Sequence, residues 1–428
     1  MDSKEKILIV PSYIASLKHY EKLVPYLEER GFEIEYSLFG KSSMSEYCEE
    51  KGLKHHILIN DQMFQDVGLK NIPIFTPIKK RGELSKKLRE FFNNYKPNLI
   101  ISAFAYNQSR MQALFSIAKE QKIRVIVLQW ALGPKENVTK HRFLRQIFKP
   151  KDYPFLFKNG AYRIHRWIVK LITKILDTLS IGPGYNYPNF TAEKYLLITE
   201  GDKEARLLMG YPEEKLKVVG SLDVEFVRNL YQEIEASPTK KESLFQKYDL
   251  NSQKKNILLI STTFHLEATT KFTDNAGQIL YFENVIQTIQ KIFPKEKATI
   301  IFKIHPREQD IYSEKYQPYG VKVFGRESSV EELVILSDLY LAHPLTSVNF
   351  SASGVYKDSI FFNFSPYDFL DETGRNFGIK EIAKTETELE NKLQQYKEGK
   401  LAKQYQDIFP KGAIENILSS IFDLKEKI

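Results

Sequence analysis

The sequence contains very little cysteine and has no long apolar run. Cys48 is the single cysteine among 428 residues, which excludes an intramolecular disulfide and is typical of a protein kept in a reducing cytosol. No stretch approaches the roughly 18 consecutive apolar residues that a membrane-spanning helix needs. The apolar run at residues 7–10 is too short for a secretory signal and is broken by Pro11. We therefore expect a soluble intracellular protein.

The length and the hydrophobic content predict more than one domain. With 428 residues, of which 42% are hydrophobic, the chain can bury a sizeable core and exceeds the usual size of one domain. Its first part predicts strands at residues 6–10, 32–36, 98–102 and 125–129, and helices at residues 17–30 and 108–120. Such alternation with short connections indicates a parallel sheet covered on both faces.

The same alternation returns in the second part of the chain. It predicts strands at residues 195–199, 216–219, 256–260, 299–304, 339–342 and 359–362, and helices near residues 203–209, 283–292 and 329–336. The predicted fold class is therefore α/β, with two doubly wound Rossmann-like domains that face a cleft. Ligands of such folds bind at the carboxyl ends of the strands.

The net charge of +8 is concentrated in one segment. Residues 139–174 contain ten Lys and Arg and one acid, Asp152, so that this segment carries +9 and the rest of the chain −1. The basicity is therefore a local patch. The sequence also lacks zinc-spaced sets of Cys and His, internal repeats and low-complexity tracts.

Within this patch, residues 161–179 have one apolar helical stripe and one basic face. The basic face and an interfacial tryptophan consist of Arg163, Arg166, Trp167, Lys170 and Lys174. This pattern is typical of helices that lie in a membrane interface and meet anionic lipid. A core-packed helix with a solvated basic face explains the pattern equally well. Nucleic acid is a weaker interpretation, because no recognition motif accompanies the charge.

The stretch FKIHPRE, residues 302–308, places basic groups where a buried strand ends. Lys303 and His305 alternate with apolar neighbours, so their side chains are expected to reach the ligand edge of the sheet. Pro306 ends the strand because it has no N–H for the sheet. A pair of such groups suits a phosphate, although a lone His-Pro is more often a simple turn.

A second polar stretch, HPLTSVNFSASG at residues 343–354, follows another predicted strand. Here Thr346 or Ser347 is expected to cap a short helix, whose first N–H groups and dipole would favour a phosphate. Plain N-capping is the alternative, since Ser and Thr cap helices everywhere. Two strand-end stretches about 40 residues apart in one parallel sheet together predict a phosphate clamp.

These motifs resemble a known group of enzymes. The order K-x-H-P-R-E, then E-E-L-x-x-x-S-D, then a strand and T-S-V-x-F is similar to the C-terminal half of bacterial GT-B transferases that build surface polysaccharides. Sialyltransferases, capsule Kdo transferases and CDP-glycerol glycerophosphotransferases belong to this group, and UDP-N-acetylglucosamine 2-epimerases are more remote. Residues 195–226 fit the same superfamily. The resemblance covers roughly residues 195–364.

The resemblance implies roles for several residues. His305 would contact the donor phosphate, Lys303 and Arg307 would add charge, and Thr346 and Ser347 would hold the same phosphate from the other side. Other residues would line the donor nucleoside or the cleft: Ser261, Thr262, Thr263, Glu331 and Glu332. The two glutamates also form a capping box with Ser328 and Ser329, and we weigh the two interpretations evenly. The family pattern has an acid or a second serine before Ser-Val, whereas this chain has His343-Pro-Leu-Thr346, which leaves the donor open.

Transfer also requires a base for the acceptor hydroxyl. Many GT-B enzymes carry a histidine near the first strand-to-helix connection, and His19 is the first candidate; a solvated helix histidine is the alternative. Glu200 and Asp202 are the other candidates, and they loosely resemble an acidic motif that sialyltransferases have in their other domain. No convincing DxD motif is present, so we expect no metal and no cofactor.

The sequence thus predicts four parts. They are an acceptor domain at residues 1–134, a membrane-association insertion at residues 135–190, a nucleotide-sugar domain at residues 191–405, and a C-terminal helical segment at residues 406–428, which is able to cross back to the first domain. The predicted activity is an inverting, metal-independent glycosyltransferase with a CMP-activated acidic sugar ahead of a UDP-sugar as donor.

The predicted partners follow from this activity. The acceptor would be a surface glycan or lipid-linked acceptor, and the enzyme would sit peripherally on the cytoplasmic face of an anionic membrane without binding nucleic acid. The alternatives are a CDP-glycerol-type transferase, an epimerase-type isomerase, and a non-catalytic glycan- or lipid-binding scaffold.

Overall fold

The structure, a computed structural model, describes the greater part of the chain. The described residues are 4–39, 43–58, 75–103, 109–130, 192–208, 211–262, 275–305, 308, 310–325, 327–344, 346, 348–364, 371, 374, 378–404 and 408–423. They divide into unit 1, which spans Met1–Leu222 and Gly412–Ile428, and unit 2, which spans Asp223–Lys411. Among the described helices, none is both long and apolar enough to cross a bilayer.

Unit 1 is built on a seven-stranded sheet with the strand order β3-β2-β1-β4-β5-β6-β7. All neighbouring strands are parallel. The strands are β1 (Lys6–Val10), β2 (Glu33–Leu38), β3 (His55–Ile57), β4 (Leu99–Ser102), β5 (Arg124–Leu128), β6 (Lys194–Leu197) and β7 (Leu216–Val218). The order of the strands reverses between β1 and β4, as it does in the Rossmann fold.

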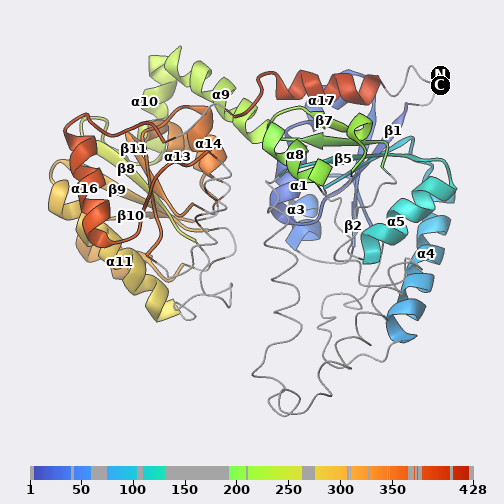
Figure 1. The fold of residues 1–428 in the computed structure, drawn as a ribbon, viewed down its shortest axis with the longest axis horizontal. Coiled ribbons are helices and arrows are strands. Elements are labelled where there is room, and N and C mark those ends of the chain that lie inside the picture. Colours follow the sequence, from blue (N-terminus) through green and yellow to red (C-terminus); the bar gives the residue numbers. More distant parts are fainter. Residues whose placement is uncertain are drawn as a thin grey trace, which may run out of the picture. The chain divides into compact units, whose positions relative to one another are not determined.

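Helices cover both faces of this sheet because apolar side chains alternate along its strands. In β1, Ile7 and Ile9 belong to one core cluster and Leu8 and Val10 to the other. The first cluster includes α1 (Ile14–Glu21), α2 (Val24–Glu29), α3 (Ser43–Lys51) and α17 (Ala413–Phe422). The second includes α4 (Phe75–Tyr95) and α5 (Ser109–Glu120), which lie on the opposite side of the sheet in Figure 1.

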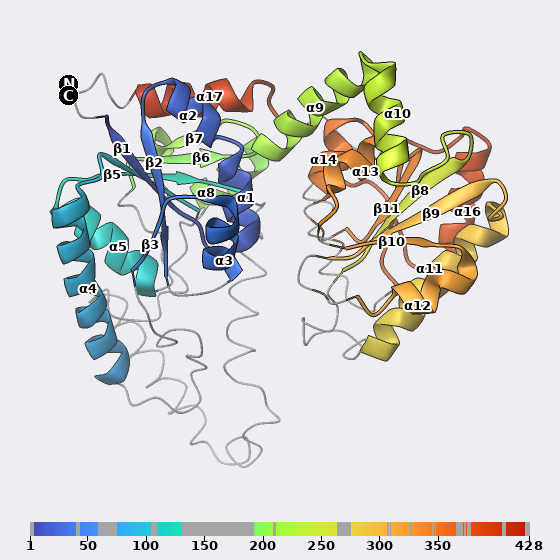
Figure 2. The ribbon, with the colours of Figure 1, turned by 180° about the vertical axis from the view of Figure 1, so that it is seen from behind.

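The C-terminal helix α17 belongs to unit 1 although it follows unit 2 in the sequence. Ile417 and Leu418 are buried with the core residues of β1 and β4, and Asn416 donates a hydrogen bond from Nδ2 to the carbonyl of Val219 (3.2 Å). In Figures 1 and 2 this helix lies beside the first elements of the chain. Of the segment expected at residues 406–428, the part from Gly412 onward therefore belongs to the first unit.

Unit 2 is built on a six-stranded sheet with the order β10-β9-β8-β11-β12-β13. Its strands are all parallel, and they are β8 (Lys255–Ile260), β9 (Ala298–Lys303), β10 (Lys322–Phe324), β11 (Leu339–Ala342), β12 (Ser359–Phe362) and β13 (Ile382–Ala383). The order reverses between β8 and β11, so unit 2 repeats the topology of unit 1. The predicted α/β fold with two Rossmann-like units is confirmed.

The helices of unit 2 also form a layer on each face of the sheet. One core cluster joins the sheet to α11 (Asn275–Ile292), α12 (Ser313–Tyr316) and α16 (Glu386–Lys397). The other joins it to α9 (Leu222–Glu235), α10 (Pro238–Lys247), α13 (Val330–Leu336) and α14 (Asn349–Gly354). Figure 2 shows these two layers on opposite sides of the strands.

Two details of the predicted organisation are wrong. The boundary expected at residue 191 separates strands that pair, because β6 continues the first sheet beside β5, with Ile126 opposite Lys194, and β7 pairs with β6. The division between the units therefore lies at Leu222 and Asp223. The single helix expected at residues 17–30 is in fact two helices, α1 and α2. The insertion expected at residues 135–190 lies outside the described residues.

Candidate functional site

The reversal of strand order in unit 2 identifies the edge where a ligand is expected. Because all six strands are parallel, their carboxyl ends lie at one edge of the sheet, and folds of this type bind ligands where the strand order reverses. Strand β8 lies between β9 and β11 at this point. The loops that follow these three strands begin with Ser261, Ile304 and His343. The stretches FKIHPRE and HPLTSV therefore follow two strands of one parallel sheet, as predicted, and these strands lie on either side of β8.

The loop after β9 directs its two basic residues to different places. Lys303 is only 5% exposed, and its ammonium group donates a hydrogen bond to the carbonyl of Gly325, in the loop after β10. His305 is half-buried beyond the end of the strand. The expectation that both side chains reach the ligand edge therefore needs correction for Lys303, because its charge is used to join two neighbouring loops.

Glu308, the last residue of the FKIHPRE stretch, holds several elements together, although its place in the sequence predicted no role for it. Its Oε2 accepts a hydrogen bond from the hydroxyl of Ser261 (2.5 Å) and one from the backbone N–H of His305 (3.2 Å). Its Oε1 accepts from the hydroxyl of Tyr312 (2.8 Å) and from the side-chain amide of Gln278. One carboxylate thus connects the ends of β8 and β9 with α11 and the start of α12.

The loop after β11 is closed by backbone turns and by Asn349. The amide of Asn349 donates hydrogen bonds to the carbonyls of His343 (3.3 Å) and Pro344 (3.2 Å), and its Oδ1 accepts one from Tyr340 (2.7 Å). The residue before α14 is Val348, whose N–H contacts Thr346 Oγ1 at 3.4 Å. Thr346 is therefore not the cap of this helix, and α14 has only six residues, so the predicted helix-end cradle is weak here.

A polar chain connects His343, at the end of β11, to the ends of the two neighbouring strands β12 and β13. His343 hydrogen-bonds Asn363 at the end of β12, and Asn363 donates to Asp371 Oδ1 (2.7 Å). Asp371 also forms an ion pair with Lys384, which follows β13. Burial lowers the pKa of His343 to about 4, while Asn363 and Asp371 act in the opposite direction. The imidazole is therefore neutral at pH 7.

Acid should destabilise the folded protein through His343. Between its usual pKa of 6.5 and its folded value of about 4, the unfolded state binds more protons, so the free energy of unfolding decreases as the pH falls. A shift of this size corresponds to about 3 kcal/mol. We expect His343→Gln to remove much of the difference in unfolding free energy between pH 7 and pH 4.5, measured by urea denaturation. An unchanged pH dependence in this variant, relative to a His55→Gln control, would contradict the assignment.

The remaining candidates of unit 2 have structural contacts of their own. Ser261 is buried, and its Oγ accepts a hydrogen bond from the N–H of His305 (2.7 Å) and donates one to Glu308. Thr262 is the next residue in the same loop after β8. Ser329 caps α13 by accepting from the N–H of Glu332 (3.2 Å) and contacts Glu331. The carboxylate of Glu332 pairs with Lys247 (2.6 Å) in α10. Ser329 is thus the cap of α13, while the carboxylate of Glu332 is engaged with α10.

The candidate bases lie in unit 1. His19 is only 3% exposed in the last turn of α1, so it is not the solvated histidine of the alternative interpretation, nor does it lie in the connection after β1. Asp202, in the first turn of α8 (Glu200–Leu208), accepts hydrogen bonds from the side chains of Gln129 (2.8 Å) and Thr199 (2.7 Å). Asp202 therefore ties α8 to the ends of β5 and β6, whereas Glu200 is exposed.

Some predicted site residues lie outside the described part of the chain. They are Thr263, Arg307 and Ser347 and the proposed membrane-contacting residues Arg163, Arg166, Trp167, Lys170 and Lys174. Within the part that is described, no group of three or more His, Cys, Asp or Glu could hold a metal ion.

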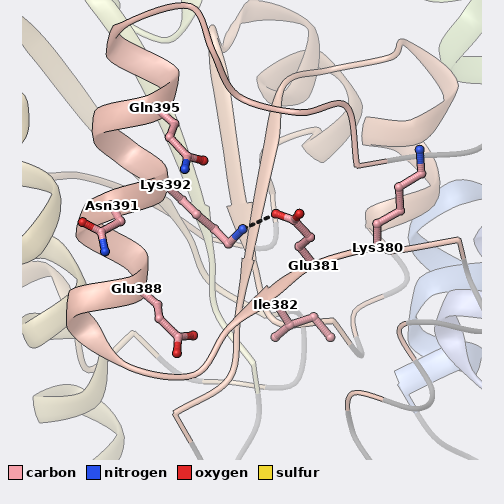
Figure 3. A pocket seen from close by; sticks show the side chains of 7 residues that line it. All are labelled: Lys380, Glu381, Ile382, Glu388, Asn391, Lys392 and Gln395. Carbon is pink, nitrogen blue, oxygen red and sulfur yellow. Dashed lines mark hydrogen bonds and ion pairs between the residues drawn. The ribbon is translucent and has the colours of Figure 1, made fainter.

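Two surface cavities of unit 2 lie away from the ligand edge. One, of about 420 Å³, is bordered by Glu381, Ile382 and the side chains of α16, and the Glu381–Lys392 ion pair (2.5 Å) crosses it, as Figure 3 shows. The other, of about 490 Å³, is lined by Lys255 and Asp358, at the amino ends of β8 and β12. Neither includes a residue from the loops after β8, β9 and β11.

Comparison with known proteins identifies the fold. No protein-family model matches the chain, and no curated protein sequence matches it. Solved structures match over nearly the whole length. UDP-GlcNAc 2-epimerase from Neisseria meningitidis, bound to UDP-GlcNAc, has a TM-score of 0.60 at 12% identity and covers 98% of this chain and 100% of its own. The likeness is one of fold.

Two further structures widen this comparison. A glycosyltransferase from Rickettsia africae has a TM-score of 0.52 at 14% identity, over 97% of this chain and 94% of its own. The Anabaena protein HepE, in complex with UDP and glucose, has a TM-score of 0.52 at 13% identity over 100% of both chains. These structures support a GT-B type of fold, whereas the finer resemblance to sialyltransferases and Kdo transferases stays a prediction.

Proposed function

We propose that the protein is a nucleotide-sugar-dependent glycosyltransferase whose unit 2 binds the donor. The observation that carries this proposal is the pair of His-Pro loops on either side of the end of β8, at the reversal of strand order. In this arrangement His305, the Ser261 end of β8 and the loop that contains Thr346 surround one position at the sheet edge. A negatively charged phosphate suits such a position, because imidazole and backbone N–H groups both donate hydrogen bonds to it.

The donor is proposed to carry UDP. The solved structures of similar fold include proteins bound to UDP-GlcNAc and to UDP with glucose. They support the choice of a UDP-sugar over the CMP-activated acidic sugar that the motif favours. A CDP-linked polyol remains the third choice, on the strength of the His-Pro motif alone.

The proposed reaction moves the sugar to a hydroxyl group. The acceptor oxygen would attack the anomeric carbon, the bond from this carbon to the nucleotide phosphate would break, and the acceptor proton would pass to a base. Of the three candidate bases, Glu200 is exposed, His19 is buried, and Asp202 is engaged with Gln129 and Thr199. Glu200 is therefore the candidate whose carboxylate is accessible to a substrate.

The acceptor is proposed to be attached to, or to lie near, a membrane. The basic and aromatic segment at residues 139–174 has the composition of a surface that meets anionic lipid. A peripheral enzyme on the cytoplasmic face would reach lipid-linked acceptors there. An enzyme that converts only a soluble nucleotide sugar has no need of such a segment.

Epimerisation is the second candidate function. It is favoured by the similar structures described as UDP-GlcNAc 2-epimerases, which match both units of this chain. Such an enzyme would change the configuration of the sugar at C2 and would transfer it to no acceptor.

One assay distinguishes these functions. The full chain is incubated with UDP-GlcNAc, UDP-glucose or a CMP-sialic acid, together with anionic vesicles that carry a lipid-linked glycan, and the sugar is followed by NMR. Release of the nucleotide with transfer of the sugar supports the proposal, and a C2 epimer supports the second candidate. If every nucleotide sugar stays unchanged and none binds, both are contradicted, and a non-catalytic scaffold is favoured. Sedimentation with the vesicles tests the membrane partner in the same samples.

A further inference from the structure

The structure assigns Glu308 as the positioning residue that holds His305 at the ligand edge. We propose that its carboxylate fixes the turn after β9 against the end of β8, so that the imidazole of His305 meets the donor phosphate in a preset orientation. This inference rests on the proposed function, because it gives a role in binding to a residue that touches no substrate itself.

The hydrogen bonds between His305, Ser261 and Glu308 all point toward the carboxylate. The N–H of His305 donates to Ser261 Oγ (2.7 Å), and the Ser261 hydroxyl donates in turn to Glu308 Oε2 (2.5 Å). The same N–H also contacts Glu308 Oε2 (3.2 Å). A carboxylate only accepts hydrogen bonds, so Glu308 sets the direction of this series of hydrogen bonds. The backbone N–H of His305 is held by two oxygens, Ser261 Oγ and Glu308 Oε2.

The other carboxylate oxygen of Glu308 is also engaged in hydrogen bonds. Glu308 Oε1 accepts from the hydroxyl of Tyr312 (2.8 Å) and from Gln278, and Gln278 also contacts Tyr312. Burial raises the pKa of Tyr312, which keeps its hydroxyl protonated and available as a donor. Since Gln278 and Tyr312 are fully buried, the far side of the carboxylate is anchored to the core of unit 2.

The residues that contact Glu308 are far apart in the sequence. Ser261, Gln278 and Tyr312 come from the end of β8, from α11 and from the residue before α12, and all three converge on Glu308. A turn that needed only to reverse the chain would be satisfied by local backbone hydrogen bonds. The side chains that converge here instead hold the end of β9 to the end of β8, beside the reversal of strand order.

This geometry makes Glu308→Gln an informative variant. Glutamine has almost the same shape, but one of its two terminal groups is an NH2 donor. In either orientation this NH2 faces a donor of the network, namely the Ser261 hydroxyl and the His305 N–H on one side, or Tyr312 and Gln278 on the other. The variant therefore disturbs the position of His305 with little change in volume.

The experiment is a double-mutant cycle on the full chain. The dissociation constant of UDP is measured by calorimetry for the wild type, Glu308→Gln, His305→Ala and the double variant, with a thermal scan of each. We expect Glu308→Gln to weaken binding about tenfold, as loss of a charged hydrogen bond does. The double variant should bind no more weakly than His305→Ala, because Glu308 acts through His305. Glu283→Gln is the matched control, since it removes a carboxylate that accepts from Tyr319 elsewhere in unit 2.

The outcomes separate the two claims. If the wild type binds UDP and His305→Ala weakens binding, while Glu308→Gln binds as the wild type does or weakens binding independently of His305, the inference is overturned and the proposed function stands. A fall in melting temperature with unchanged affinity also overturns it, because it shows a purely structural role. If the wild type binds no nucleotide, the proposed function fails, and the inference fails with it.

Discussion

Replacement of His305 by alanine is expected to weaken the binding of UDP by about ten- to a hundredfold. His305 is half-buried at the end of β9, beside the reversal of strand order, and a hydrogen bond from its ring to a phosphate is worth about 1.5–3 kcal/mol. The change removes no large apolar side chain, so the melting temperature should move little. Calorimetric titration with UDP measures the affinity, and a thermal scan of the same samples measures the stability.

His55→Ala is the matched control for this prediction. His55 is also half-buried, but it lies in β3 of unit 1, where its Nδ1 is 3.0 Å from the carbonyl of Leu53. This variant should bind UDP as the wild type does. Equal affinity of His305→Ala and the wild type would remove His305 from the phosphate site, and equal losses in both variants would show that the effect is not local.

The second large effect is expected in stability, from Lys384→Met. The ammonium group of Lys384 forms an ion pair with Asp371, whose side chain is 2% exposed, so methionine leaves a carboxylate buried without its lysine. The expected cost is about 3 kcal/mol, the lower end of the range for a buried ion pair, because the Lys384 side chain is 32% exposed. Asp371 also accepts from Asn363, which hydrogen-bonds His343, so the loop after β11 should loosen and UDP should bind more weakly. Urea denaturation followed by circular dichroism measures the loss.

An exposed ion pair supplies the comparison. Lys400 pairs with Glu398 at the surface of the same unit, where both side chains are well exposed, and Lys400→Met should leave the free energy of unfolding nearly unchanged. If the two lysine variants lose similar amounts of unfolding free energy, the pair at Asp371 contributes no more than a surface pair. The buried chain from His343 to Lys384 would then have no special role in holding its loop.

Much of the fold could be predicted because the central strands have strong local patterns. Strands β1, β4, β8, β9 and β11 are short apolar runs, mostly of Ile, Leu and aromatic residues, which are largely buried and are bounded by polar or turn residues. Of the short strands, β7 was predicted but β3, β10 and β13 were not, because two or three residues carry little period. Strand β6 pairs with β5 although β5 ends at Leu128 and β6 begins only at Lys194. No local sequence pattern predicts a pairing over such a separation.

The candidate site was predicted in outline and missed in its supporting contacts. The two His-Pro stretches could be placed at the carboxyl edge, because a parallel sheet brings the ends of its strands together. Glu308 stands in the quoted motif, but its partners Ser261 and Gln278 are 47 and 30 positions away in the sequence. Only the fold brings these residues together. Lys303 was misjudged for the same reason, since Gly325 is a long-range partner.

A crystal structure of the full chain with UDP would test most directly whether unit 2 binds the donor phosphate. We predict that the diphosphate lies at the carboxyl edge of the sheet of unit 2, over the end of β8, with an oxygen within hydrogen-bond distance of His305. Binding at the amino edge, beside Lys255 and Asp358, or in unit 1 would contradict the proposed site. A diphosphate at the predicted edge but out of reach of His305 would preserve the site and contradict the role of this residue.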